Sequence, residues 1–288
     1  MQEIARDVFI ESKYPGVVVG AIRSAHGQIL IDAPLRMEDV RSWRTSLEKI
    51  SGGDERLLIN LDTHLDRTLG VKGMECMVIA HHKSIMMIRS RPQTSKNQEK
   101  ETCATWESYD GLSSIRWIPP EITFDEKVYL NWGNNEIILE HHFGANAAGV
   151  WVSIPTQKVI FVGDSVVNQQ PPFLAFADMD EWLNDMKLLL SIRFRDYKIV
   201  NGRNGLVTQN DVREMVRMIN SIRTPFESLK EKRADCEEVY DLASKILRQF
   251  DDQPDSQEIF LNRLKWGLSM YYEQHVLSHK NLNSEKQP

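Results

Sequence analysis

The segment 60–70, with the sequence NLDTHLDRTLG, restricts the fold of this chain more than any other. An apolar strand is predicted directly before it, at 57–60, and a helix after it. Its ionisable side chains are Asp62, His64, Asp66 and Arg67. Their spacing allows them to converge in a turn, so the fold gathers several ionisable groups at the end of one strand. Such a group is stable only where metal ions or protein cations balance its charge.

The remaining pattern predicts a mixed α/β domain over 1–210 and an α-helical extension over 211–278. β-branched and aliphatic runs predict strands at 17–22, 29–31, 57–60, 76–80, 127–132, 136–142, 149–155, 158–164 and 197–200. Apolar residues at helical spacing predict helices at 37–50, 180–195, 211–232, 234–250 and 256–277. The polar stretch 91–127 is typical of a functional loop. The tail 279–288 is expected to be disordered.

Charge and composition narrow the function classes. The net charge is −6 and no run of Lys and Arg forms a basic face, so no nucleic-acid partner is expected. No window approaches the roughly 18 apolar residues of a membrane helix, so no membrane partner is expected either. Cys76, Cys103 and Cys236 form no paired motif, which favours reduced thiols and a cytoplasmic location. The expected partner is a small-molecule ligand or substrate.

Several motifs together resemble those of the metallo-β-lactamase superfamily. That superfamily carries His-x-His-x-Asp-His after a strand, and alignment on Gly70 places the ligand positions at Asp62, His64, Asp66 and Arg67. The supporting segments are Ile31–Asp32, 144–152 with Asn146 in a histidine position, 159–164 ending at Asp164, and 199–205 with Arg203 in a histidine position. The resemblance covers roughly 8–215. It implies a four-layer αββα sandwich and metal-dependent hydrolysis of an ester, thioester, amide or phosphoester.

The residues in the ligand positions imply an altered metal site. His64, Asp66 and Asp164 match the family, whereas Asp62, Arg67, Asn146 and Arg203 do not. The second metal site would need donors at 67 and 203, where arginine stays protonated and offers no lone pair. The first site, formed by Asp62, His64, Asn146 and Asp164, could hold one ion at most. Zn, Mn or Fe would suit such a set, with Asp66 as the catalytic base.

A metal-free arrangement competes with the single ion. At about 4 Å and an effective dielectric near 20, each carboxylate pair would cost on the order of 4 kcal/mol. Arg67 and Arg203 could offset this repulsion as replacements for the metal ligands, with His64 neutral. The expected function is then a degenerate site that lacks dinuclear hydrolase activity and binds an anionic small molecule through both arginines. The alternative is a mononuclear metal-dependent hydrolase.

Two further expectations concern other parts of the chain. His81–His82 and His141–His142 end two predicted strands, where neighbouring side chains point to opposite faces. At most one histidine of each pair can therefore face the site. His82 and His142 are the first choices as alternative metal ligands. The apolar stripes of the helical extension predict packing onto the main domain, and a homodimer through these helices is the second interpretation.

Overall fold

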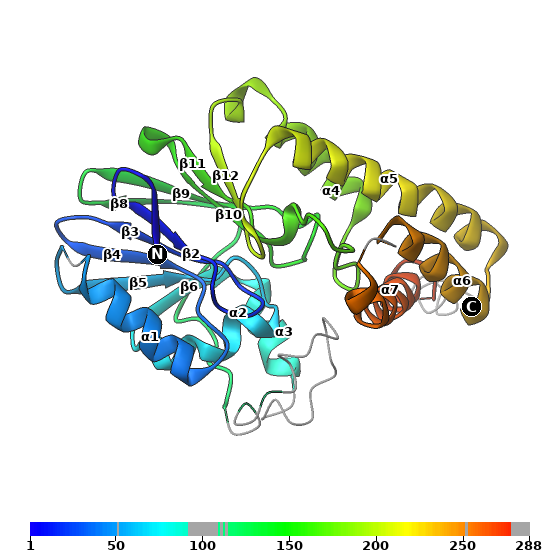
Figure 1. Cartoon of the computed structure of the whole chain (residues 1–288), viewed down its shortest axis with the longest axis horizontal. Helices are drawn as coiled ribbons and strands as arrows, with labels where there is room; N and C mark the ends of the chain where they lie inside the picture. Colours follow the sequence, from blue (N-terminus) through cyan, green and yellow to red (C-terminus); the bar gives the residue numbers. More distant parts are fainter. Residues whose placement is uncertain (51, 92–108, 110–111, 113–114, 251–252, 278–288) are drawn as a thin grey trace, which may run out of the picture.

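The computed structural model describes residues 1–50, 52–91, 109, 112, 115–250 and 253–277. Two β-sheets pack face to face, and helices cover both outer faces (Figure 1). The predicted four-layer αββα architecture with a C-terminal helical extension is confirmed. Among the described residues, no helix has both the length and the apolar composition that crossing a bilayer requires.

The first sheet has seven strands in chain order. They are β1 (Gln2–Ala5), β2 (Val8–Glu11), β3 (Val19–Arg23), β4 (Gly27–Ile31), β5 (Glu55–Ile59), β6 (Met77–His81) and β7 (Ile122–Phe124). Strands β1 to β4 pair antiparallel, whereas β4 to β7 are parallel. The carboxyl ends of β4, β5 and β6 therefore meet at one edge of the sandwich.

The second sheet has six strands in the order β13-β12-β11-β10-β9-β8. Their bounds are β8 (Lys127–Trp132), β9 (Asn135–His141), β10 (Val150–Ile154), β11 (Val159–Phe161), β12 (Lys198–Asn201) and β13 (Gly205–Val207). Only β11 and β12 pair in parallel. The loops that follow β11 and β12 project toward the same end of the sandwich as the loops that follow β4 and β5. Two backbone hydrogen bonds between the sheets show this: Val18 N, just before β3, donates to Gly202 O after β12, and Val150 N, at the start of β10, donates to Leu61 O after β5.

Three apolar clusters hold the layers together. The first lies between the sheets and includes Ile22 and Leu139. The second packs α1 (Met37–Glu48) onto the first sheet through the fully buried Trp43. The third packs the second sheet against α4 (Met179–Leu189) and the extension, and includes Trp182. The remaining helices are α2 (Leu65–Thr68), α3 (Lys83–Ser90), α5 (Gln209–Lys232), α6 (Cys236–Leu247) and α7 (Gln257–Tyr272).

The extension shares its core with the sandwich. Helices α5 to α7 lie together beyond α4 at one end of the molecule (Figure 1). Their apolar stripes are buried within the chain, at Val239, Leu242, Ile246, Phe260, Leu264, Leu268 and Tyr272. Packing onto the main domain thus accounts for the stripes, and a homodimer would need another face of these helices. The tail 279–288 lies outside the described residues.

Several short elements were not anticipated from the sequence. Strands β1, β2, β7 and β13 contain only three or four residues each, too few to give a clear alternation. Helix α3 begins directly after His82, and Met86 within it is 74% exposed. Within the polar stretch 91–127 expected to be a functional loop, residues 92–108, 110–111 and 113–114 lie outside the described residues.

Candidate functional site

The candidate site lies at the carboxyl ends of parallel strands from both sheets. The segment 60–67 follows β5, and Asp32 follows β4. Asp164 follows β11, and Arg203 follows β12. Because β4 pairs in parallel with β5, and β11 with β12, these four segments leave the sandwich at the same end. The fold thus brings together ionisable residues that are spread along the chain from Asp32 to Arg203.

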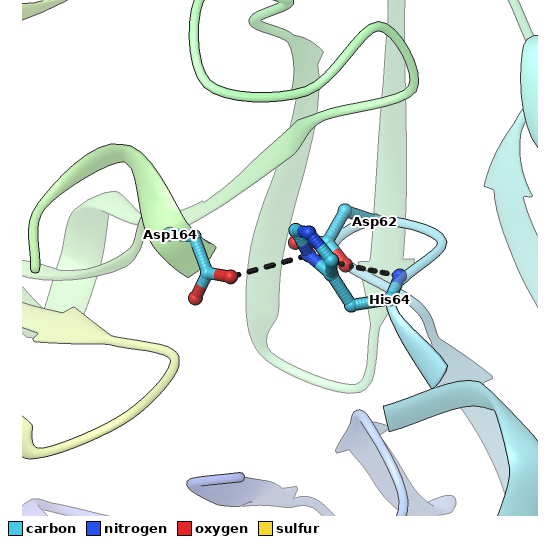
Figure 2. Close-up of side chains that lie close together, drawn as sticks. All are labelled: Asp62, His64 and Asp164. Carbon is cyan, nitrogen blue, oxygen red and sulfur yellow. Dashed lines mark hydrogen bonds and ion pairs between the residues drawn. The ribbon is translucent and has the colours of Figure 1, made fainter. Parts of the chain in front are cut away.

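His64 lies between two carboxylates. Its Nδ1 is 3.1 Å from Asp62 Oδ1 and 3.2 Å from Asp164 Oδ2, and its backbone N–H donates to Asp62 Oδ1 at 2.9 Å (Figure 2). All three side chains are buried. Their candidate ligand atoms lie within 4.8 Å of one another, and among the residues that the structure describes they form the one such group of three or more possible metal ligands of the types His, Cys, Asp and Glu.

Arg67 is fully buried within a ring of aspartates. Its Nη2 donates to Asp164 Oδ1 at 2.7 Å, and its Nη1 lies 3.0 Å from Asp62 Oδ2. Asp32 Oδ2 is 3.6 Å from Nη1, and Asp66 Oδ1 is 3.9 Å from Nε. The guanidinium therefore contacts one oxygen each of Asp62 and Asp164, the two carboxylates that flank His64.

Arg203 approaches Asp164 from the other side. Its Nε donates to Asp164 Oδ1 at 2.9 Å and its Nη2 to Asp164 Oδ2 at 2.6 Å, which is a bidentate pair. Its Nη1 donates to Asp66 Oδ2 and, at 2.7 Å, to Gly16 O. The two arginines together thus satisfy both oxygens of Asp164, and Arg203 links Asp66 to Asp164.

A glycine makes room for Arg67. A Cβ atom added at Gly202 would stand 2.7 Å from Arg67 Nη2, 2.8 Å from Nη1 and 3.0 Å from Asp164 Oδ1. Real Cβ contacts are not this short, so any larger residue would displace the guanidinium. The backbone after β12 is therefore shaped around the buried Arg67–Asp164 pair.

The charges of this cluster balance within the protein. Burial alone would raise the pKa of Asp62 and Asp164, but the guanidinium groups outweigh it and hold both below their usual range. Burial opposes the charge of His64, yet Asp62 and Asp164 raise its pKa to about 10. His64 is then an imidazolium at neutral pH and, with Arg67 and Arg203, matches the charges of Asp62, Asp66 and Asp164. This corrects the expectation that His64 is neutral.

Asp32 is a further buried carboxyl beside the cluster. Its Oδ1 accepts from Leu61 N at 3.0 Å and from Asn60 Nδ2 at 3.3 Å, and its backbone φ is +54°. Burial raises its pKa to about 7, since the nearby Arg67 compensates only part of the desolvation. Near neutral pH this carboxyl is therefore partly protonated and carries only part of a negative charge.

The fit to metal ions differs between the two family sites. The second site does not fit, because Asp66 and Asp164 are already joined by Arg203 and no lone pair is offered at 67 or 203. Asp62, His64 and Asp164 could hold a single ion by the spacing of their ligand atoms. Asn146 is buried, and its Oδ1 accepts from Ala148 N at 2.9 Å, which occupies one of the two lone pairs of that oxygen.

The alternative histidines lie in other contacts. His82 Nδ1 is 2.5 Å from Asp125 Oδ1, and His142 Nδ1 is 2.7 Å from Asp185 Oδ1. Neither belongs to the group around His64. Their neighbours His81 and His141 stack on each other with ring centroids 3.6 Å apart.

Phe173 is a part of the site that the sequence did not indicate. Its ring lies 5.1 Å from the His64 ring and 4.4 Å from the Arg203 guanidinium, and its side chain is buried. It belongs to the connection between β11 and α4, for which only the pair of prolines at 171–172 gave a signal, that of irregular backbone. The ring covers the cluster on the side of the helical extension.

The comparisons with known proteins rest on structure. No protein-family model and no curated protein sequence matches this chain. A metallo-β-lactamase family protein from Thermus thermophilus aligns with 96% of this chain and 95% of its own, at 13% identity and a TM-score of 0.66. A metallo-β-lactamase from Pontibacter korlensis aligns with 76% of this chain and 97% of its own, at 18% identity and a TM-score of 0.56.

A larger protein also shares the helical extension. The sec-alkylsulfatase Pisa1 from Pseudomonas sp. aligns with 99% of this chain at 13% identity and a TM-score of 0.65, and the chain spans 51% of that protein. At these identities the likeness concerns the fold. The chain has the metallo-β-lactamase fold, completed by a C-terminal helical extension.

Proposed function

We propose that this chain is a metallo-β-lactamase-fold protein whose centre is neutralised by arginines instead of a dinuclear metal site. The observation that supports this proposal is the double contact of Asp164 with Arg67 and Arg203. By the family resemblance, this carboxylate would bridge two ions. Here both of its oxygens accept hydrogen bonds from guanidinium groups, and the cluster is balanced without added cations.

We further propose that the site binds an anionic small molecule through Arg203. Arg67 lies among four aspartates with no exposed surface, which makes it a structural counter-ion. Arg203 also contacts a backbone carbonyl, at Gly16, and stacks on Phe173. A phosphate-like or carboxylate group would compete with Asp66 for its Nη1, because arginine binds such groups through the same planar fork.

A thermal-shift titration with inorganic phosphate tests anion binding. Phosphate at constant ionic strength should raise the Tm of the wild-type protein more than chloride does, because a ligand of the native state stabilises it. The increment should vanish in R203M and persist in R217M, which alters an exposed arginine on α5. Equal shifts in phosphate and chloride, or an unchanged increment in R203M, would overturn this assignment.

A mononuclear hydrolase is the second candidate, and the spacing of Asp62, His64 and Asp164 favours it. A divalent ion held there would supply Lewis-acid activation of water, and Asp66 would act as the base. Asp66 is buried and paired with Arg203, so a base function would require that pair to open. Hydrolysis of 4-nitrophenyl acetate or of a 4-nitrophenyl phosphoester that depends on added Zn, Mn or Fe, and that D164N abolishes, would favour this candidate over the first.

A further inference from the structure

The C-terminal helix α7 reaches the charged centre through an aromatic ring. The guanidinium of Arg263 lies 4.3 Å from the centroid of Phe173, and that of Arg203 lies 4.4 Å from the same ring. His64 contacts the ring at 5.1 Å. Arg263 is 2% exposed, so its stacking on Phe173 takes place away from water, where a cation–π contact is strongest.

The extension contacts the connection between β11 and α4 on both sides of Phe173. Arg263 Nη1 donates to Gln170 Oε1 at 2.8 Å and to Pro171 O at 3.3 Å. Further contacts to this connection come from the extension, namely Gln253 Nε2 to Gln169 O, Gln274 Nε2 to Ala175 O, and Tyr271 Oη with Met179 N. Gly267 permits the close approach, since a Cβ there would stand 3.2 Å from Leu174 Cβ.

From these contacts we infer that Arg263 is a positioning residue, which fixes Phe173 over His64 and Arg203 and thereby makes the helical extension a wall of the central site. Arg263 acts through the ring and the backbone beside it, because its contacts include Phe173, Phe260, Gln170 and Pro171. Arg263 has this role whether the centre binds an anion, one metal ion or neither.

Hydrogen–deuterium exchange of the full chain, followed by mass spectrometry, tests the inference. The amides of segment 60–69 are tied to the cluster, as His64 N donates to Asp62 Oδ1 and Leu61 N to Asp32 Oδ1. R263M should speed exchange across 60–69 by about tenfold, because loss of the stacking allows the wall to open locally. Exchange in β3 and β4 should not change. R263K, which keeps the cation, should lie closer to the wild-type protein than R263M.

A second variant separates positioning from general destabilisation. F173L removes the ring and should produce the same local increase by itself. Adding R263M to F173L should then add little, because residues that act through one contact are not additive. R217M serves as the control and should leave all peptides unchanged. Unchanged exchange across 60–69 in R263M or F173L, an equal rise in β3 and β4, or full additivity in the double variant would overturn the inference.

Discussion

Replacement of Arg67 by methionine removes the central cation while keeping a side chain of similar length. Arg67 is fully buried and contacts Asp164 at 2.7 Å and Asp62 at 3.0 Å. Removing one partner of a buried ion pair costs about 3–5 kcal/mol, since the remaining charge is left uncompensated. With two carboxylates affected, a loss of about 4 kcal/mol or more is expected. For a chain of this size, that corresponds to a fall in Tm of roughly 10 °C.

Thermal unfolding of R67M, R67K and R217M gives the comparison. R67K keeps the charge but lacks the planar fork, so its Tm should lie between those of R67M and the wild-type protein. Arg217 pairs with Glu214 on the surface, where an ion pair contributes at most about 1 kcal/mol, and R217M should change Tm by no more than about 2 °C. If R67M lowered Tm no further than R217M, Arg67 would not be the counter-ion of the buried aspartates. Added Mn²⁺ should stabilise R67M more than the wild-type protein.

Three further predictions concern neighbouring residues. Asp32 has a pKa of about 7 in the folded protein against an ordinary value of 3.8, so it stabilises most at low pH and its ionisation destabilises as pH rises through 7. The difference in unfolding free energy between D32N and the wild-type protein should therefore shift by about 3 kcal/mol in favour of D32N from pH 4.5 to pH 8.5, and a pH-independent difference would refute this. G202A should lower Tm by several degrees, because the added Cβ clashes with Arg67. In an R67M background the same substitution should lower Tm little further, whereas a Tm loss in the double variant equal to the sum of the two single losses would show that the clash lies elsewhere. In an R67H/R203H background, which should bind metal, H82A and H142A should leave the metal content unchanged, whereas a loss of bound ion in either would return that histidine to the ligand set.

Much of the fold could be predicted because its signals are local. The apolar run in 158–164 predicts a strand, and β11 (Val159–Phe161) lies within it. The order of motifs from Asp32 to Arg203 restricts how such strands can be arranged. The set Asp62, His64 and Asp164 was implied by the resemblance to the metallo-β-lactamase superfamily, and the segments that carry these residues follow β5 and β11 in the structure.

Charge states and long-range packing could not be predicted in the same way. The pKa of His64 depends on carboxylates from two different loops, whose oxygens lie 3.1 and 3.2 Å from its Nδ1. The residue types alone do not give these distances, and His64 was therefore expected to be neutral. Arg263 lies 90 positions after Phe173 and meets it only because α7 packs against the connection between β11 and α4. Nothing in the local sequence of either residue indicates such a contact.

The metal content of the protein tests the central claim most directly. Protein purified without chelators and without a metal-affinity resin would be examined by elemental analysis, with the R67H/R203H double variant treated in parallel. An arginine-neutralised centre predicts far less than one ion of Zn, Mn or Fe per wild-type chain, because His64, Arg67 and Arg203 already balance Asp62, Asp66 and Asp164. The double variant should gain metal. One stoichiometric ion in the wild-type protein would contradict the claim.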